Sequence, residues 1–233
     1  MKKVLLFALM LVAMTAIAQK DVTKFLGIPV DGYKADMKKN LIAKGFTYDA
    51  QYDYFKGEFN GRNVNVYIAT NNNRVWRIMV CDAIRSNATD IRIRFNTLCR
   101  QFSKNKKYMT LDLGETDYTI PENEDISYEM LVNKKRYEAA YSQIPDPLLL
   151  DTVAIQNRIK KELLKVYKQY ELDNPSYKQK EEIELITQRE NLKIALEIMT
   201  KKLVWFCINE DYGDYFISIF YDNEYNRADG EDL

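Results

Sequence analysis

A single hairpin pattern restricts the fold of this chain more than any other feature. Residues 54–70 read YFKGEF, then Asn60-Gly61, then RNVNVYIAT. Asn-Gly suits the two positive-φ positions of a type I′ turn, whose twist matches that of the antiparallel strands it joins. In the second strand apolar and polar residues alternate, so one face of the sheet is expected to be buried and the other solvated. The apolar positions are Val64, Val66 and Ile68.

Five further segments have the composition of strands. RVWRIMVCDA follows a turn at Asn71-Asn72-Asn73, and RYEAAYSQI stands just before Pro145. The last two segments, LVWFCINE and DYFISIFYD, are apolar on both faces, which is typical of central strands that are covered on two sides. The predicted strands span residues 74–83, 126–132, 136–144, 203–210 and 214–222.

Two helices are predicted in the first half of the chain. Over residues 33–44 apolar residues recur at helical spacing, with Asp31 placed to cap the start and Gly45 to follow the end. A second helix is expected from Asn87 to Lys104. Its apolar stripe consists of Ile91, Phe95, Leu98 and Phe102. A weak internal echo is also present, because a helix followed by hairpin strands occurs near the start and, less clearly, near the end.

Residues 151–202 are predicted to form a helical hairpin inserted between two strands. Apolar residues recur at helical spacing on either side of Asp173-Asn174-Pro175, and neither junction with a strand has the composition of a linker. We therefore expect one α+β domain over residues 19–233, with an antiparallel meander sheet, packed helices and this insertion. A separate helical domain on mobile linkers is the alternative. In the first arrangement four stripe residues should be buried: Leu163, Val166, Leu192 and Leu196.

The first 18 residues have the three parts of a secretory signal peptide. They read MKKVLLFALMLVAMTAIA, in which Lys2 and Lys3 precede a short apolar run and a small-x-small site ending at Ala18. Gln19 comes next, where a bacterial lipoprotein has Cys, so no lipid anchor is expected. The later apolar segments are too short to span a membrane. We predict a periplasmic or secreted protein whose mature chain has no membrane span.

The composition argues against most catalytic classes. The chain contains no histidine, which removes the usual general base and the commonest metal ligand. It also lacks the Gly-x-Ser-x-Gly and glycine-rich phosphate motifs. Removal of Lys2 and Lys3 with the signal peptide leaves 32 basic and 34 acidic residues, a balance with no attraction for nucleic acid. We therefore expect a protein that is not an enzyme and holds no cofactor.

Neither the cysteines nor the acidic C-terminus forms a recognisable metal motif. Cys81, Cys99 and Cys207 are far apart in sequence and are expected to be small buried hydrophobes, although a disulfide between two of them is left open. The ending YDNEYNRADGEDL is rich in oxygen ligands. An EF-hand loop starting at Asp222 would need glycine where Arg227 stands and glutamate at its last position, which is leucine. We interpret this stretch as a solvated tail.

Three stretches of the chain carry a resemblance to known proteins: KFLGIPVDGYKADMKKNLIAKGFTYD, GEFNGRNVNVYIATNNNRVWRIMV and YFISIFYDNEYNRADGEDL. They resemble a group of uncharacterised exported proteins from Gram-negative gut anaerobes. Residues 22–82 are also similar to the small helix-and-sheet units of β-lactamase-inhibitor-like and SmpA/OmlA-like envelope proteins. The helical hairpin is not part of that unit. The second resemblance implies a role in binding proteins, and neither brings catalytic residues.

Aromatic side chains remain as candidates for a functional surface. Tyr67, Trp76, Trp205 and Tyr215 stand in predicted strands, where they can form a platform for a protein or a sugar ring. Aromatic residues in strands more often pack against neighbouring strands or a helix. The sequence favours a non-catalytic binding module that presents a sheet face to a protein or glycan partner. The alternative is a secreted carboxylate-dependent hydrolase or a carbohydrate-binding protein.

Overall fold

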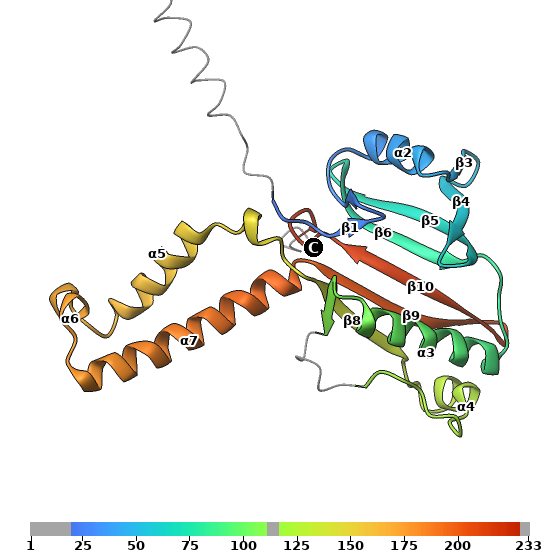
Figure 1. The fold of residues 1–233 in the computed structure, drawn as a ribbon. Helices are drawn as coiled ribbons and strands as arrows, with labels where there is room; N and C mark the ends of the chain where they lie inside the picture. The colour runs from blue at the N-terminus through green and yellow to red at the C-terminus, as the bar shows by residue number, and fades with distance from the viewer. Residues whose placement is uncertain (1–19, 111–116, 229–233) are drawn as a thin grey trace, which may run out of the picture.

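The fold is α+β and is built on one eight-stranded antiparallel sheet, as the sequence predicts. The computed structural model describes residues 20–110 and 117–228 (Figure 1), so the predicted signal peptide lies outside the described residues. The strand order is β3-β4-β5-β6-β10-β9-β8-β7, and every neighbouring pair is antiparallel. The strands are β3 Thr47–Asp49, β4 Tyr54–Phe59, β5 Arg62–Asn71, β6 Arg74–Asp82, β7 Tyr108–Thr110, β8 Glu138–Gln143, β9 Leu203–Asp211 and β10 Asp214–Asp222.

The sheet has two halves of the same plan. Helix α2 (Lys34–Ala43) is followed by strands β3 to β6, and helix α3 (Ala88–Lys104) is followed by β7 to β10. The last strand of each half, β6 and β10, pair at the centre of the sheet. The structure therefore contains two helix-plus-four-strand units joined edge to edge, and the second begins at α3, earlier in the chain than the internal echo in the sequence indicates. A separate two-stranded ribbon, β1 Lys24–Phe25 and β2 Ile28–Pro29, precedes the first unit.

The turns form where the local sequence predicts them. Asn60 and Gly61 both have positive φ, 52° and 69°, and join β4 to β5 as an Asn-Gly hairpin. Gly45 has a φ of 94° and follows α2, where its N–H and that of Phe46 bond back to the carbonyls of Ile42 and Leu41. This is the double hydrogen bond of a Schellman motif.

The predicted cap of α2 is wrong. The residue at the N-cap is Tyr33, which makes no side-chain cap hydrogen bond. The carboxylate of Asp31 instead accepts hydrogen bonds from the N–H of Gly32 and from the side chain of Asn226. A contact with the far end of the chain has replaced the local cap.

Helix α3 covers the second half of the sheet and supplies much of its core. Its predicted stripe is buried, and its N-cap Asn87 accepts from the N–H of Asp90. The rings of Phe95 and Phe102 lie 5.1 and 5.4 Å from that of Phe206 on β9. On the same helix, the buried side chain of Arg94 forms an ion pair with Asp82 at the end of β6, with an N–O distance of 3.0 Å. Helix α3 is thus held to both halves of the sheet.

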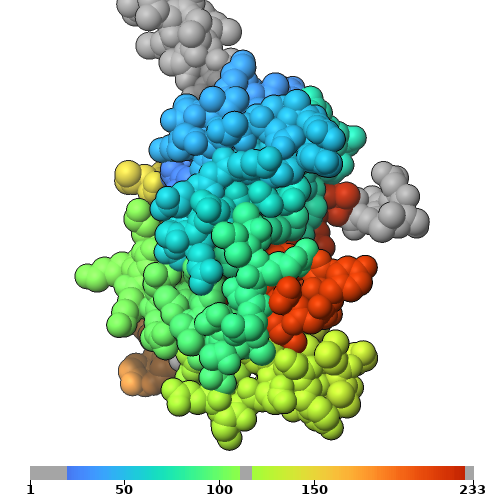
Figure 2. Space-filling model, turned by 90° about the vertical axis from the view of Figure 1, so that its right-hand side faces the viewer, coloured from blue at the N-terminus to red at the C-terminus, as the bar shows by residue number. Residues whose placement is uncertain are grey.

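The strand predicted over residues 126–132 is wrong, because residues 126–131 form a helix. Helix α4 (Ile126–Leu131) is capped by Asp125, whose carboxylate accepts from the N–H of Tyr128. The alternating pattern of ISYEMLV fits a helix as well as a strand, because helical geometry also brings Ile126 and Met130 to one face, where they pack against the core. Helix α4 forms the yellow-green surface beside the red turn between β9 and β10 in Figure 2.

Residues 151–202 form helices that project from the sheet as an arm (Figure 1). The arm consists of α5 (Thr152–Leu163), α6 (Gln169–Asp173) and α7 (Tyr177–Thr200), and α5 packs along α7. It interrupts the sheet between β8 and β9, which are hydrogen-bonded neighbours. A short 3₁₀ helix, Pro147–Leu149, leads into it.

The predicted burial of the arm stripe is wrong. Val166 is 63 % exposed because α5 ends at Leu163, itself only partly buried, and Val166 lies in the turn that follows. Leu192 is 51 % exposed and Leu196 is also exposed. Helix α7 carries apolar residues on two opposite faces, and the face that packs against α5 is the isoleucine face. Its members include Ile183, Ile194 and Ile198, which are buried or partly buried.

Candidate functional site: the open face of the sheet

The two faces of the sheet differ in burial. On β10 the residues at odd positions, such as Ile217 and Ile219, are buried beneath α3. The residues at even positions point to the opposite face, and Phe216 and Phe220 are only partly buried there. The prediction that β10 is a central strand is confirmed, while its second face is only partly covered. We call this second side the open face.

An aromatic cluster occupies the open face where β6, β10 and β9 meet. Trp205 and Phe220 are direct cross-strand neighbours, and their rings stack with centroids 4.0 Å apart and an interplanar angle of 17°. The guanidinium of Arg77 lies 4.9 Å from the ring centre of Phe220 and 4.4 Å from that of Trp76. Arginine placed over aromatic rings in this way contributes cation–π attraction. These four residues, Trp76, Arg77, Trp205 and Phe220, are the open-face cluster.

Asp222 holds the cluster in place. Its buried carboxylate, 1 % exposed, accepts hydrogen bonds from Arg77 Nε at 2.6 Å and Nη2 at 2.7 Å. It also accepts from the indole Nε1 of Trp205 at 3.0 Å. A bidentate arginine pair is a strong charge-assisted interaction with fixed geometry. Both carboxylate oxygens are therefore engaged in positioning the rings, and neither is free to act as a general base.

A β-bulge brings Trp76 to the open face beside Arg77. The register of β5 with β6 shifts between Ala69 and Thr70, which pair with Arg77 and Val75 respectively, so Trp76 has no partner on β5. Val75 and Ile78 are both buried in the core. The two residues between them are therefore displaced together toward the opposite side, as a bulge allows.

A shallow hollow of about 410 Å³ adjoins the cluster. Tyr67 and Met79 contribute its apolar wall, and three polar side chains in contact with one another lie on its floor. Among them the Cys81 thiol lies 3.2 Å from Ser218 Oγ, and Asn209 Nδ2 donates to the same oxygen at 2.9 Å. The charged residues Asp82 and Arg85 also line the hollow, so it combines apolar, neutral polar and charged groups, which suits contact with a protein surface.

The three cysteines are free thiols. Cys81 and Cys207 both pair with Ser218 from opposite sides of β10, so their Cα atoms are about 10 Å apart, beyond the roughly 7 Å limit for a disulfide. Cys99 lies in α3 on the other side of the sheet. Burial raises the pKa of the Cys207 thiol to about 11 and also raises the pKa of Cys81. Neither is a reactive thiolate at neutral pH.

Three of the four predicted contact aromatics lie on the open face, and one does not. Trp76 and Trp205 belong to the cluster, and Tyr67 lines the hollow. Tyr215 is 2 % exposed in the core, and its hydroxyl bonds to Ser127 Oγ at 2.9 Å. It belongs to the buried face of β10, so its choice as a contact residue is wrong. Sequence analysis missed Phe220, although the period-two pattern of DYFISIFYD separates it from Tyr215.

The interpretation of the C-terminal stretch as a solvated tail is wrong for its first residues. Asp222 and Asn223 are buried, and Asn223 Nδ2 donates to the carbonyl of Val30. Asn226 Nδ2 donates to Asp31 and to the carbonyl of Val75. The segment therefore ties the N-terminal ribbon to the sheet with the oxygen and amide groups that looked like metal ligands. Residues 229–233 lie outside the described part of the chain.

Comparison with known proteins assigns no function to the open face. The chain matches no protein-family model, no curated protein and no solved structure. Within residues 20–110 and 117–228, no three His, Cys, Asp or Glu side chains are grouped to hold a metal ion. In the same residues no helix is both long enough and apolar enough to cross a membrane.

Proposed function

We propose that this protein is a non-catalytic binding module of the periplasm or the cell exterior, and that its open face binds another protein. The observation that carries the proposal is the open-face cluster, in which Trp76, Trp205 and Phe220 surround Arg77 without being buried. Tryptophan and arginine are the residue types that most often dominate the binding energy of protein interfaces. Asp222 fixes the arginine in advance, so little conformational freedom is lost on binding.

The geometry favours a protein partner over a sugar ring. A sugar-binding platform needs an exposed aromatic face, whereas Phe220 stacks against the ring of Trp205 at 4.0 Å. The stack covers one face of each of these two rings, and the surface that remains combines apolar rings with the guanidinium of Arg77, which suits the mixed surface of a protein.

The pairing of the carboxylates near the open face also argues against the hydrolase alternative. Asp222 and Asp82 are each held by two nitrogens of an arginine, Arg77 and Arg94 respectively. A carboxylate-pair hydrolase needs one acid and one base that face a bound substrate. Carboxylates locked in bidentate ion pairs supply neither role, which supports a binding function.

The proposal is tested by affinity capture with matched surface variants. Mature protein is immobilised and exposed to envelope and culture fractions of the native host, beside Met79→Glu on the open face and Leu192→Glu on the arm. Both positions are partly or largely exposed, so both variants should fold with nearly unchanged melting temperatures. We expect proteins captured by the wild type to be retained by Leu192→Glu and lost by Met79→Glu. Identical capture by all three proteins would refute the proposal.

A further inference from the structure

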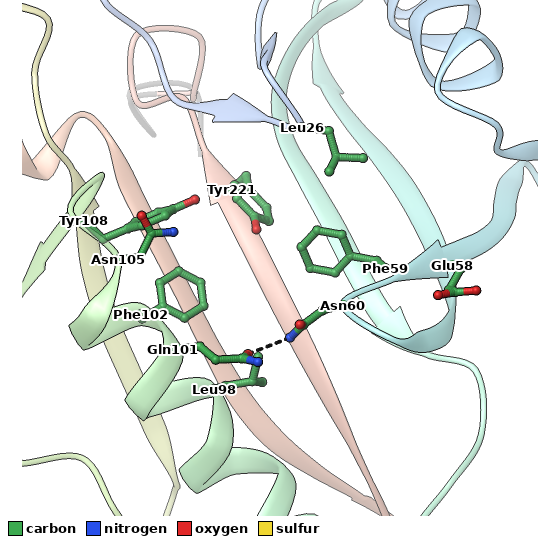
Figure 3. A pocket seen from close by; sticks show the side chains of 10 residues that line it. All are labelled: Leu26, Glu58, Phe59, Asn60, Leu98, Gln101, Phe102, Asn105, Tyr108 and Tyr221. Atoms are coloured by element: carbon green, nitrogen blue, oxygen red, sulfur yellow. Dashed lines mark hydrogen bonds between the residues drawn. The ribbon is translucent and has the colours of Figure 1, made fainter.

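A cleft lies on the core side of the molecule, away from the open face. Two hollows, of about 450 Å³ and 880 Å³, share the lining residues Leu26, Phe59, Asn105, Tyr108 and Tyr221 and are therefore continuous. Figure 3 shows the first hollow between helix α3 on one side and the β4–β5 hairpin with Leu26 on the other. Each of the two hollows has a volume in the range of small-molecule sites, which is about 300–1,000 Å³.

The middle of the cleft is aromatic. Phe102 and Tyr108 enter from the side of α3 and β7, Phe59 enters from the hairpin, and Tyr221 of β10 lies between them (Figure 3). Phe102 and Tyr221 belong to the buried core, while Phe59 and Tyr108 are only partly buried. Gln143 Nε2 donates a hydrogen bond to the hydroxyl of Tyr108 over 3.2 Å, so the partly buried phenol of Tyr108 has a polar partner at the edge of the floor. This surface suits an apolar chain or ring.

One end of the cleft is spanned by a hydrogen bond between two amides. Asn60 Nδ2, at the tip of the hairpin, donates to Gln101 Oε1 of α3 over 2.8 Å (Figure 3). The bond links the two halves of the fold across the hollow. A ligand lying on the aromatic floor is therefore limited at this end and must extend toward the other.

The other end carries an excess of positive charge, because four lysines and two aspartates, Asp21 and Asp146, line it. Lys24, Lys106 and Lys107 line it and are exposed, and no carboxylate among the described residues forms a salt bridge with any of them. Lys202, by contrast, is buried and bonds Asp21 Oδ1 at 2.6 Å. Three ammonium groups that have no ion-pair partner within residues 20–110 and 117–228, beside an aromatic floor, favour a ligand that carries a negative charge at one end.

We propose that this cleft binds an amphipathic carboxylate, with its apolar chain on the aromatic floor and its carboxylate beside Lys24, Lys106 and Lys107. The aromatic floor supplies affinity in proportion to the apolar area it covers. The three lysines select the charged end. The site is independent of the open face, because the two lie on opposite sides of the sheet.

Saturated fatty acids are suitable probes of this proposal. Displacement of the anionic dye 1-anilinonaphthalene-8-sulfonate is measured with octanoate, decanoate, dodecanoate and the neutral 1-dodecanol. We expect saturable displacement whose affinity rises up to about fourfold per added methylene, because each buried methylene contributes about 0.8 kcal/mol. Dodecanoate should bind at least about tenfold more tightly than dodecanol, because only the acid meets the lysines.

Charge-reversal variants locate the site. The double variant Lys106→Glu/Lys107→Glu should weaken dodecanoate binding about tenfold or more and leave dodecanol binding nearly unchanged. The matched control, Lys160→Glu/Lys161→Glu on the exposed surface of α5, makes the same charge change on the arm and should bind both ligands as the wild type does. All these lysines are exposed, so the variants should fold normally.

Four results would overturn the proposal. The first is no saturable displacement by any of the acids. The second is equal affinity for dodecanoate and dodecanol. The third is dodecanoate binding by Lys106→Glu/Lys107→Glu that equals that of the wild type. The fourth is loss of dodecanoate binding in Leu192→Ser and unchanged binding in the cleft variant, which would place the ligand on the exposed apolar face of the arm.

Discussion

Both faces of strand β10 carry aromatic residues, but the two faces have different roles. On the inner face, Tyr215, Ile217, Ile219 and Tyr221 are all buried beneath helix α3 or its neighbours. On the outer face, aromatic residues alternate with polar ones, and the rings are held in place by an ion pair and by stacking. One face supplies the hydrophobic stabilisation of the fold. The other keeps a fixed arrangement of rings at the surface, which the core does not require.

The largest expected effect is on the inner face. Phe206→Ala removes a fully buried ring that contacts Phe95, Phe102 and Tyr141, so it should lower the free energy of unfolding by about 3–5 kcal/mol. Urea denaturation followed by circular dichroism measures the change. A loss below about 1 kcal/mol would mean that the two faces do not differ as the structure indicates.

The arm extends the comparison to a helix with one packed and one exposed face. Ile194→Ala should cost about 2 kcal/mol, because Ile194 is buried between α5 and α7 in a two-helix contact. Leu192→Ala, two residues away on the opposite face, should change stability by no more than about 0.5 kcal/mol. Thermal denaturation of the two variants makes the test. Equal losses would show that the leucine face is also covered.

On the open face, Phe220→Ala should have a modest effect on stability. It removes the stacking with Trp205 and one wall of the Arg77 site, for which about 1 kcal/mol is expected. Urea denaturation is again the measurement, with Phe206→Ala as the reference. A loss as large as that of Phe206→Ala would mean that the outer aromatics are core residues.

The smallest effect concerns the rates at which the thiols react. At pH 8, iodoacetamide should modify Cys81 faster than Cys99 in the folded protein, because Cys81 is partly exposed on the open face and Cys99 is buried in α3. Burial raises the pKa of Cys99 to about 12, so its thiolate is scarce until the protein unfolds. Mass spectrometry of peptides after timed quenching gives both rates. Faster labelling of Cys99 would contradict the assignment of faces.

The features that are predicted correctly from the sequence are those that depend on residues close together in the chain. The Asn60-Gly61 turn and the stripe of α3 depend on neighbouring residues only, and both are present. The burial predicted for Leu192 and Leu196 is wrong because α7 has two opposite apolar faces. No local feature of the sequence determines which face packs against α5.

The candidate site depends even more on contacts between distant residues. The bulge that turns Trp76 outward appears only in the register of β5 with β6. The pairing of Arg77 with Asp222 joins residues 145 positions apart. Period-two alternation does place Phe220 and Asp222 on one face of β10, so this part of the site was accessible from the sequence.

The central claim is that the open face binds a protein partner and contributes little to stability. The most direct test is the dissociation constant of a captured protein, measured by surface plasmon resonance for the wild type, Phe220→Ala and the arm control Leu192→Ala. We expect Phe220→Ala to weaken binding about thirtyfold, the effect of an interface residue worth about 2 kcal/mol, and Leu192→Ala to bind as the wild type does. Unchanged binding by a folded Phe220→Ala variant would contradict the claim.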